Sequence, residues 1–245
     1  MSKILLLVEG EKREKQLFDH FYKLYRERNV KIKPVEIVSF NTEIYSFYNE
    51  LKKLDHNDRI DYGSIDLPLF LNEYHGLKGN KQLNSADYTE KILIFDFDPQ
   101  DSKYSPNEVV ELMENFSDST TIGKLYLNYP MLESFKDIAS LEDANFINTT
   151  CSKNMLFKKE YKQHINEQAR KNKINNINKI SQDTAEKLID LHRQKLEFIT
   201  RLSSSASEKY LNLCQEQCRK FNEEDLMWVI NTSILHLYDE YGSLN

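Results

Sequence analysis

Hydrophobic and polar positions alternate in blocks along the first half of the chain. Four apolar runs are typical of buried strands, and they cover residues 3–8, 34–40, 91–98 and 124–130. Apolar residues at helical spacing lie between and after these runs and predict helices at 11–28, 42–54, 105–116 and 130–138. Alternating strands and helices are typical of a parallel sheet with helices on both faces. The pattern therefore predicts an α/β fold with about four mainly parallel strands.

Two regions depart from this alternation. Residues 55–90 are polar and rich in turn formers, which predicts an irregular insertion or flap. After residue 145 only helical patterns follow, and they predict helices at 156–172, 181–202, 206–221 and 222–244, with a loop and helix cap near 201–211. We therefore expect an α/β domain at 1–145 and an α-helical C-terminal extension at 146–245.

Composition narrows the class of protein. The chain has 245 residues, of which 40% are hydrophobic and 29% charged, as expected for a globular protein with a core of useful size. No apolar stretch approaches the roughly 20 residues that a membrane span requires. The N-terminal apolar run is short and an acid follows it directly, unlike a signal peptide. Together with an odd number of cysteines, three, this predicts a cytoplasmic protein with free thiols and no membrane partner.

Acidic residues follow three of the four predicted strands. Glu9 comes after the first strand, Asp96 and Asp98 after the third, and Glu133 after the fourth. Functional groups gather at the carboxyl ends of parallel strands, and side chains at i and i+2 of an extended segment point the same way. Converging carboxylates repel one another unless a hard cation such as Mg²⁺ or Mn²⁺ binds between them. The set predicts metal-assisted phosphoryl chemistry, whereas each acid alone would indicate a solvated turn.

The net charge of −6 conceals a cationic segment. Residues 151–180 contain eight lysines and arginines against two glutamates. The candidates for binding nucleic-acid phosphates are Lys158, Lys159, Lys162, Arg170, Lys171 and Lys173. A solvated helix face is the alternative interpretation of the same pattern, with about equal weight.

The sequence LLLVEGE, with Glu9 and Gly10, followed some 85 residues later by ILIFDFD, resembles the TOPRIM domain. Topoisomerases, bacterial primases, overcoming-lysogenization-defect nucleases, the ribosomal 5S maturase and a recombination-repair scaffold share that Rossmann-like domain. VEGEKRE and NYPMLES more narrowly resemble the small TOPRIM proteins of restriction-associated and abortive-infection loci, which have an E-G-E-x-x-E opening and a late N-P-x-x-E segment. Here Tyr129 separates Asn128 from Pro130, a departure from that pattern. The resemblance covers about residues 3–140.

The resemblance implies roles for individual residues. Glu9 would be the general acid/base or a metal ligand, Asp96 and Asp98 would hold the metal, and Glu133 would complete the site. Gly10, without a β-carbon, would let a phosphate backbone approach the strand end. Two further assignments have surface alternatives: Glu14 is either near the metal or a solvated helix acid, and Asp101 either joins the site or lies in a surface loop.

The resemblance also implies a function. We expect a Mg²⁺-dependent endonuclease that acts as the toxic effector of a prokaryotic anti-phage defence system, with DNA, tRNA or other RNA as substrate. No G-x-x-x-x-G-K-[ST] loop occurs, so an ABC- or SMC-like ATPase would be a separate partner. Self-association into a homo-oligomer is left open. The alternatives are a TOPRIM scaffold that binds nucleic acid or protein without cutting, and an RNA-maturation nuclease.

Overall fold

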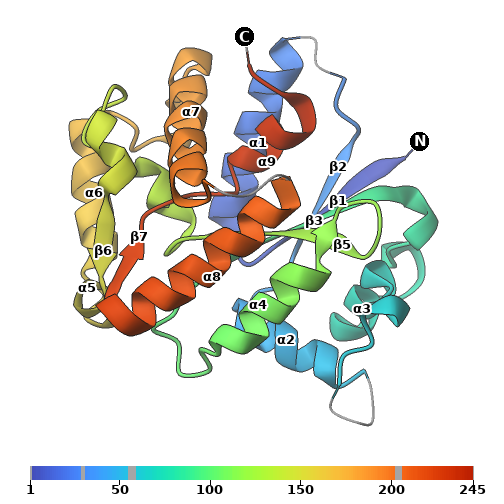
Figure 1. Ribbon diagram of the computed structural model, residues 1–245. Coiled ribbons are helices and arrows are strands. Elements are labelled where there is room, and N and C mark those ends of the chain that lie inside the picture. Colours follow the sequence, from blue (N-terminus) through green and yellow to red (C-terminus); the bar gives the residue numbers. More distant parts are fainter. Residues whose placement is uncertain (1, 29–30, 55–58, 202–205, 245) are drawn as a thin grey trace.

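A computed structural model describes residues 2–28, 31–54, 59–201 and 206–244, and its centre is a five-stranded sheet of order β2-β1-β3-β5-β4 (Figure 1). The strands are β1 (Lys3–Val8), β2 (Val35–Ser39), β3 (Tyr88–Asp96), β4 (Ser117–Asp118) and β5 (Gly123–Asn128). Four strands run parallel and only β4 is antiparallel, to β5. The predicted α/β class with a mainly parallel sheet is confirmed, with one short strand more than expected.

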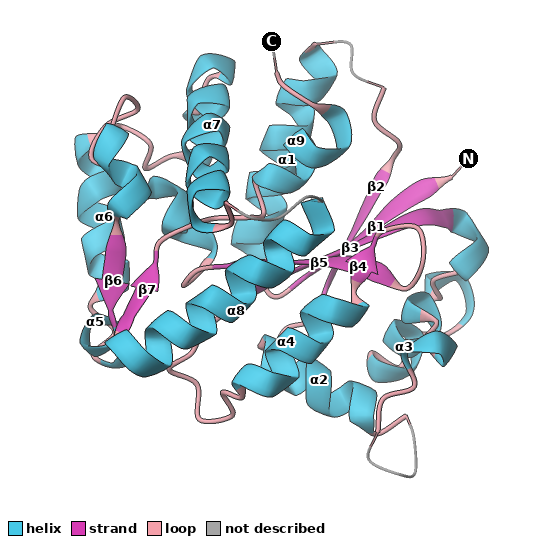
Figure 2. Ribbon diagram, in the orientation of Figure 1, coloured by secondary structure: helices cyan, strands magenta, loops and turns pink. Residues whose placement is uncertain are grey.

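The apolar runs form central strands because the sheet is covered on both faces. Leu6 of β1 lies between Ile37 of β2 and Ile92 of β3, and Phe95 of β3 pairs with Leu127 of β5. Figure 2 shows helices on either side of these strands. One layer contains α1 (Lys12–Glu27), α7 (Gln182–Ile199) and α9 (Leu235–Tyr241), and the other α2 (Ile44–Lys52), α3 (Leu67–Tyr74) and α4 (Pro106–Asn115). The helices predicted at 11–28, 42–54 and 105–116 are therefore confirmed to within two residues.

The predicted irregular insertion at 55–90 is wrong in part, because it contains helix α3. Asp66 caps this helix by accepting a hydrogen bond from the backbone N–H of Leu69 (3.0 Å), and Pro68 stands in its first turn. Leu67, Phe70 and Leu71 are buried. Asp66 followed by Leu67 and Pro68 is a helix-start signal that the sequence analysis did not recognise. Residues 55–58 of the expected insertion lie outside the described residues.

The helix predicted at 156–172 is wrong as one element. The chain instead forms α5 (Lys153–Phe157), a turn with Lys159 at φ 58°, and α6 (Tyr161–Lys171). The turn buries Tyr161, whose hydroxyl donates to Asp137 (2.9 Å). Satisfying this internal hydrogen bond decides where the second helix begins.

The helix predicted at 222–244 is also wrong as one element, although α9 (Leu235–Tyr241) lies within this range. Helix α8 (Ala206–Glu224) ends first, and β7 (Leu226–Trp228) then pairs with β6 (Thr150–Ser152). The chain next passes along the end of β5, where Ile230 bridges Tyr129 and Thr232 donates to the carbonyl of Leu127 (2.7 Å). Short apolar runs fit a helix or a strand equally well, and here the tertiary partner decides. The loop predicted near 201–211 lies partly outside the described residues.

The segment after Pro130 forms a 3-10 turn (Leu132–Lys136) instead of the predicted α-helix. The side-chain amide of Asn231 donates to the carbonyl of Leu132 (2.6 Å), an acceptor that an α-helix would use internally. The C-terminal part thus shapes the end of the α/β part directly. No described helix is long and apolar enough to cross a membrane, and the three cysteines are buried with free thiols.

Candidate functional site

The carboxyl ends of the parallel strands bring three predicted acids together. Glu9 follows β1, Asp96 ends β3, and Asp98 lies two residues further on. All three side chains are half-buried. The segment from β6 to α6 lies at this edge of the sheet, toward the left of Figure 1. The acids therefore lie near a junction between the sheet and the C-terminal part, with some contact to solvent.

Glu9 is held by the neighbouring strand. Its Oε2 atom accepts a hydrogen bond from the backbone N–H of Asp96 (3.0 Å). The next residue, Gly10, leaves room for the carboxylate of Glu14, whose oxygens lie 2.9 Å from where a β-carbon would stand. Glu14 is thus folded back over the end of β1, and its charge raises the pKa of Glu9. The sequence left two interpretations of Glu14 open, and the structure favours the one that places it near the site instead of on a solvated helix face.

Asp96 is positioned by a side chain from the adjacent strand. Asn128 pairs with Asp96 in the β3–β5 register and donates its amide to Asp96 Oδ1 (3.1 Å). The side-chain oxygen of Asn128, Oδ1, accepts a hydrogen bond from the backbone N–H of Ser233 in turn (3.2 Å). A C-terminal residue therefore fixes the amide orientation of Asn128. The role of Asn128 was not predicted, although it stands in the segment that carries the family resemblance.

Asp98 adopts a backbone conformation that is rare for residues with a side chain, with φ at 36°. Gln100 donates its amide to Asp98 Oδ1 (2.9 Å), and the N–H of Asp101 donates to the carbonyl of Asp98 (3.0 Å). The hydroxyl of Tyr45 holds the carbonyl of Phe97 between the two acids. This turn aims Asp98 toward the strand ends and stores backbone strain, which is typical of functional sites.

The three acids lack cationic partners. Burial raises the pKa of Glu9 to about 8, and the charge of Asp98 adds to this against the hydrogen bond from Asp96 N–H. Burial, then the charges of Glu9 and Asp98, raise the pKa of Asp96 well above its usual value. Burial also raises the pKa of Asp98, with Asp101 adding to it and Gln100 opposing it. Within the described ranges no lysine, arginine or histidine forms an ion pair with any of these acids.

The donor set suits a hard cation. Besides three carboxylates, the site offers Oε1 of Gln100, an oxygen shielded from solvent that has no hydrogen-bond partner among the described residues. Oxygen ligands of this kind are those that Mg²⁺ prefers. In the described part of the chain no three Asp, Glu, His or Cys side chains converge as a ready metal site, because Glu9 and Asp96 are turned toward hydrogen-bond donors. Asp96 and Asp98, with Glu9, would hold the ion after side-chain rotation.

Glu133, the fourth predicted acid, has a different environment. It is buried and forms ion pairs with Arg13 of α1 and, more distantly, with Lys162 of α6 (3.9 Å). Burial lowers the pKa of the neighbouring Lys136, an effect that Glu133 opposes. The charge of Glu133 also raises the pKa of Asp98, so it lies near the site. Its cationic partners make it an anchor between α1 and α6 instead of a free ligand.

A hollow of about 620 Å³ opens beside Gly10, between the ends of β1 and β2 and the first turns of α1. Lys12 and Lys15 line it together with Ser39 and two acids, Glu11 and Asp19. Both lysines are exposed and form no ion pair among the described residues. Two unpaired cations beside a strand end suit a phosphate group. The sequence analysis did not predict a role for Lys12 and Lys15, although they stand in the segment EGEKREK immediately after the first strand.

The six cations predicted to bind nucleic acid are all exposed. Lys158 and Lys159 occupy the turn between α5 and α6, and Lys162 lies in the first turn of α6. Arg170 and Lys171 end α6, and Lys173 follows it. Lys162 is the one of these six with an ion-pair partner in the described structure.

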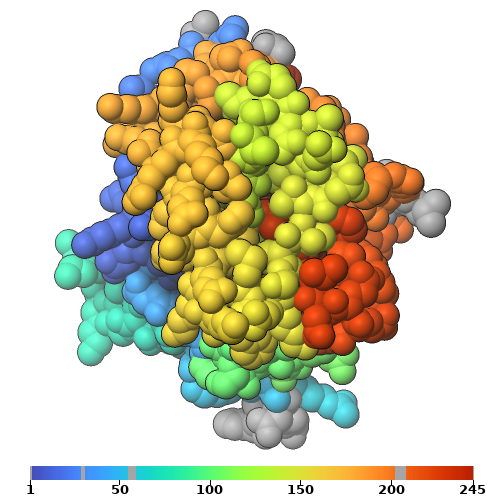
Figure 3. All heavy atoms as spheres, turned by 90° about the vertical axis from the view of Figure 1, so that its left-hand side faces the viewer, coloured from blue at the N-terminus to red at the C-terminus, as the bar shows by residue number. Residues whose placement is uncertain are grey.

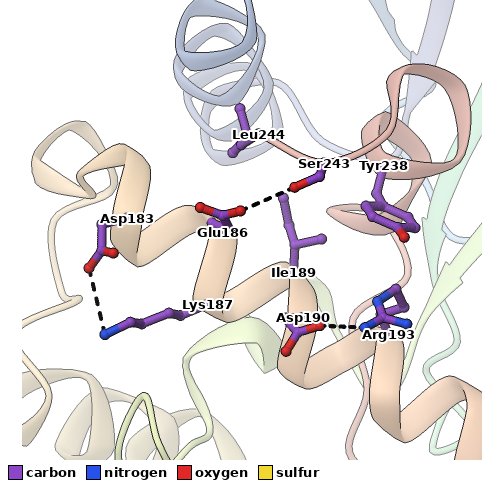
Figure 4. A pocket seen from close by; sticks show the side chains of 9 residues that line it. All are labelled: Asp183, Glu186, Lys187, Ile189, Asp190, Arg193, Tyr238, Ser243 and Leu244. Atoms are coloured by element: carbon purple, nitrogen blue, oxygen red, sulfur yellow. Dashed lines mark hydrogen bonds and ion pairs between the residues drawn. The ribbon is translucent and has the colours of Figure 1, made fainter. Parts of the chain in front are cut away.

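A second hollow, of about 550 Å³, lies between α7 and the C-terminal segment (Figure 4). Its charged groups face one another: Lys187 pairs with Asp183 (3.7 Å), and Arg193 pairs with Asp190 (2.6 Å). Ser243 donates to Glu186 (3.1 Å). Both cations of this hollow pair with acids of the same hollow, so it offers no free cation for a ligand. The acids at the strand ends are therefore the stronger candidate for a functional site.

Comparison of the chain with protein-family models, curated proteins and solved structures gives no match. The resemblance to TOPRIM proteins stays a prediction from the motifs around Glu9, Asp96 and Asp98.

Proposed function

We propose that this protein is a Mg²⁺- or Mn²⁺-dependent endonuclease that hydrolyses phosphodiester bonds of nucleic acid. One observation carries the proposal: three half-buried carboxylates face one edge of a parallel sheet without a cationic partner in the described structure. Structural acids at such depth are normally paired, as Glu133 is. The lack of a cationic partner is explained if a cation from solution completes the site.

The residues of the chain take distinct parts in this proposal. A bound divalent ion supplies an acidic water and neutralises charge that develops on the phosphate. Asp96 and Asp98 hold the ion, and Gln100 and Asn128 orient their carboxylates. Glu9 holds or transfers a proton at Oε1 or Oε2, for which a pKa of about 8 before ion binding is suitable.

The lysines beside Gly10 have a binding role. Lys12 and Lys15 receive a backbone phosphate in the hollow at the ends of β1 and β2. Because Gly10 has no side chain, the phosphate approaches the strand end, provided that the carboxylate of Glu14 swings away.

The biological role rests on the resemblance alone. By analogy with small TOPRIM proteins of defence loci, we propose a toxic effector that a separate ATPase controls during phage infection. Such an arrangement would keep the nuclease silent in uninfected cells. Co-expression with an ATPase encoded beside the gene, followed by phage challenge, tests this part separately from the chemistry.

Glu9→Gln tests the chemistry. We expect cleavage of plasmid DNA and of bulk tRNA by the purified full-length protein to require Mg²⁺ or Mn²⁺. The substitution should lower the rate by about 100-fold or more, the scale for one positioned acid–base group. Glu114→Gln, an exposed acid near the end of α4 and away from the strand-end acids, is the matched control and should cut like wild type. Circular dichroism checks that both variants fold. Equal cleavage by Glu9→Gln and wild type would refute the nuclease and favour the scaffold alternative.

A further inference from the structure

Phe157 is an aromatic side chain that the core does not use. It ends α5, and 56% of it is exposed, the largest value among the large hydrophobic residues of the described chain. Tyr74 is also exposed, but its ring stacks on Phe40 with centroids 4.3 Å apart. Phe157 belongs neither to the hydrophobic core nor to the residues packed against it. Single exposed apolar residues are common, so its surroundings decide whether the ring has a use.

The backbone that carries Phe157 is well defined. Ser152 caps α5 by accepting the N–H of Met155 (3.3 Å), and Leu156 is buried. After the helix, the N–H groups of Lys158 and Lys159 donate to carbonyls of the last turn (both 3.0 Å). Lys159 lies in the left-handed region that closes a helix end. The ring therefore projects from a fixed corner, and its presentation to a ligand costs little conformational entropy.

The corner is positively charged. Lys158 and Lys159 directly follow the ring, are exposed and form no ion pair among the described residues. Lys162 lies one helical turn further, and Glu160 is the single acid between these lysines. An exposed ring followed directly by two free cations matches a strand of nucleic acid, in which flat bases alternate with phosphates. An apolar partner surface would leave the lysine charges unpaired.

The corner also shares a face with the candidate site. Figure 3 views the molecule from the carboxyl ends of the strands, with the segment 150–180 in the centre. That segment meets the N-terminal part on one side and the loop region after β3 below. Lys162 connects the two areas through its ion pair with Glu133. A strand lying across this face would contact the corner and reach the acids.

We propose that Phe157 is a stacking platform for an unpaired base, while Lys158 and Lys159 bind the adjacent phosphates. The inference rests on the proposed nuclease function and specifies its substrate: single-stranded nucleic acid, or the loop of a folded one. A base inside a duplex cannot offer its face to the ring. The substrate is therefore selected by the presence of an unpaired base and not by groove contacts.

Binding in EDTA tests this proposal without cleavage. The probes are fluorescein-labelled dT12, U12 and a blunt 12-base-pair DNA duplex, titrated with full-length protein by fluorescence anisotropy at several salt concentrations. Phe157→Ala should weaken binding of the single strands by about 5- to 150-fold, the cost of losing one stacked base. Duplex affinity and the salt dependence should not change. Phe157→Trp should retain single-strand binding, and the stronger of dT12 and U12 shows whether the DNA or the RNA strand is preferred.

Leu69→Ala is the matched control, because Leu69 of α3 is also apolar and is 54% exposed. It should bind every probe like wild type. The proposal is overturned if wild type binds no single strand, if Phe157→Ala binds single strands like wild type, or if it loses single-strand and duplex binding equally. Because the readout is binding without metal, these outcomes are independent of the Glu9→Gln cleavage test.

Discussion

Two groups of ionisable side chains in this molecule are driven toward their neutral forms, for different reasons. At the strand ends burial raises the pKa values of Glu9, Asp96 and Asp98, and the charges of neighbouring acids raise them further. In the C-terminal part, burial lowers the pKa of Lys195 to about 7 and that of His192 to about 3. The first group keeps contact with solvent, whereas the second is fully enclosed.

The partners of the two groups differ as well. Lys195 donates to the carbonyls of Phe146 (2.8 Å) and Thr149 (2.6 Å) and so fixes the chain that leads into β6. His192 accepts the backbone N–H of Asn231 (3.0 Å). These bases stabilise local structure through hydrogen bonds to the backbone. A shifted pKa by itself therefore does not indicate function; like charges that converge at a solvent-accessible edge do.

The largest expected effect concerns acid stability. The pKa of His192 is about 3 in the folded protein, whereas an unfolded histidine has one near 6.5. The unfolded state therefore takes up a proton first as pH falls, and stability is lost from pH 6.5 down to 3. The difference corresponds to at most about 5 kcal/mol. His192→Asn, which keeps an acceptor for Asn231, should remove much of this pH dependence in urea unfolding.

His20→Asn on α1 controls for the loss of one imidazole, because His20 is only half-buried. It should unfold with the pH dependence of wild type. A His192→Asn protein that loses stability between pH 6.5 and 3 as steeply as wild type would show that His192 takes up a proton without unfolding. The enclosed group would then resemble the strand-end group more closely than the structure indicates.

The next largest effect is on metal affinity. Asp96→Asn should weaken Mg²⁺ or Mn²⁺ binding by at least about 10-fold in calorimetric titration, since losing a ligand costs no less than losing a supporting residue. In EDTA the same variant should be more stable by about 1 kcal/mol or more. The reason is that a neutral amide has no charge to bury and none to repel Glu9 and Asp98, the two effects that raise the pKa of Asp96.

Asp183→Asn, an acid in the first turn of α7, is the control. It should leave metal affinity unchanged and should not stabilise the protein in EDTA, because it removes a partner of Lys187. If Asp96→Asn and wild type bind metal equally well, the strand-end acids are not a metal site. If Asp96→Asn is less stable in EDTA, the hydrogen bond from Asn128 outweighs the repulsion.

Local sequence rules predict the parts of this fold whose own apolar pattern fits one kind of element. The strands at 3–8 and 91–98 and the helix after Glu9 are predicted because continuous apolar runs and helical spacing match a doubly covered sheet. Helix α3 was predictable from Asp66 and Pro68, but the polar segment around it obscured the signal. The helix assigned to 222–244 was not predictable as β7 and a buried loop, because its short apolar runs also fit helical spacing and the partners that decide, β6 and Tyr129, are about 75 and 100 residues away.

The same distinction applies to the site. Glu9, Asp96 and Asp98 could be predicted together because parallel strands end at one edge. The sequence pattern could not predict which partner each acid has. The hydrogen bond from Asn128 to Asp96 depends on strand register, and the ion pair between Arg13 and Glu133 depends on where α1 lies. Sequence thus predicted which acids meet, and structure shows which of them lack a counter-charge.

A smaller effect is expected on nucleic-acid binding by the cationic segment. Neutralising Lys158, Lys159 and Lys162 to glutamine should reduce the slope of log affinity against log salt by roughly one for each phosphate that the protein no longer neutralises. Glutamine is preferable to glutamate because an acid at 162 would face buried Glu133. Lys23, Lys78 and Lys81, which are exposed elsewhere, give a control triple with the same charge change. Equal salt-dependence slopes for the two triple variants would show that the cationic segment is a solvated helix face.

The smallest effect should come from Glu133, and it separates the paired acid from the unpaired ones. Arg13 and Lys162 already balance its charge, so it has little to gain from a metal ion. We expect Glu133→Gln to change Mg²⁺ or Mn²⁺ affinity by less than about twofold, within the usual range for a group outside the ligand set. Stability should fall by about 1 kcal/mol or more, because a buried charge-assisted hydrogen bond becomes neutral. Calorimetric titration and urea unfolding measure the two effects on the same samples. If Glu133→Gln instead lowers metal affinity as far as Asp96→Asn does, Glu133 leaves Arg13 to bind the ion, and all four acids at the strand ends form one site.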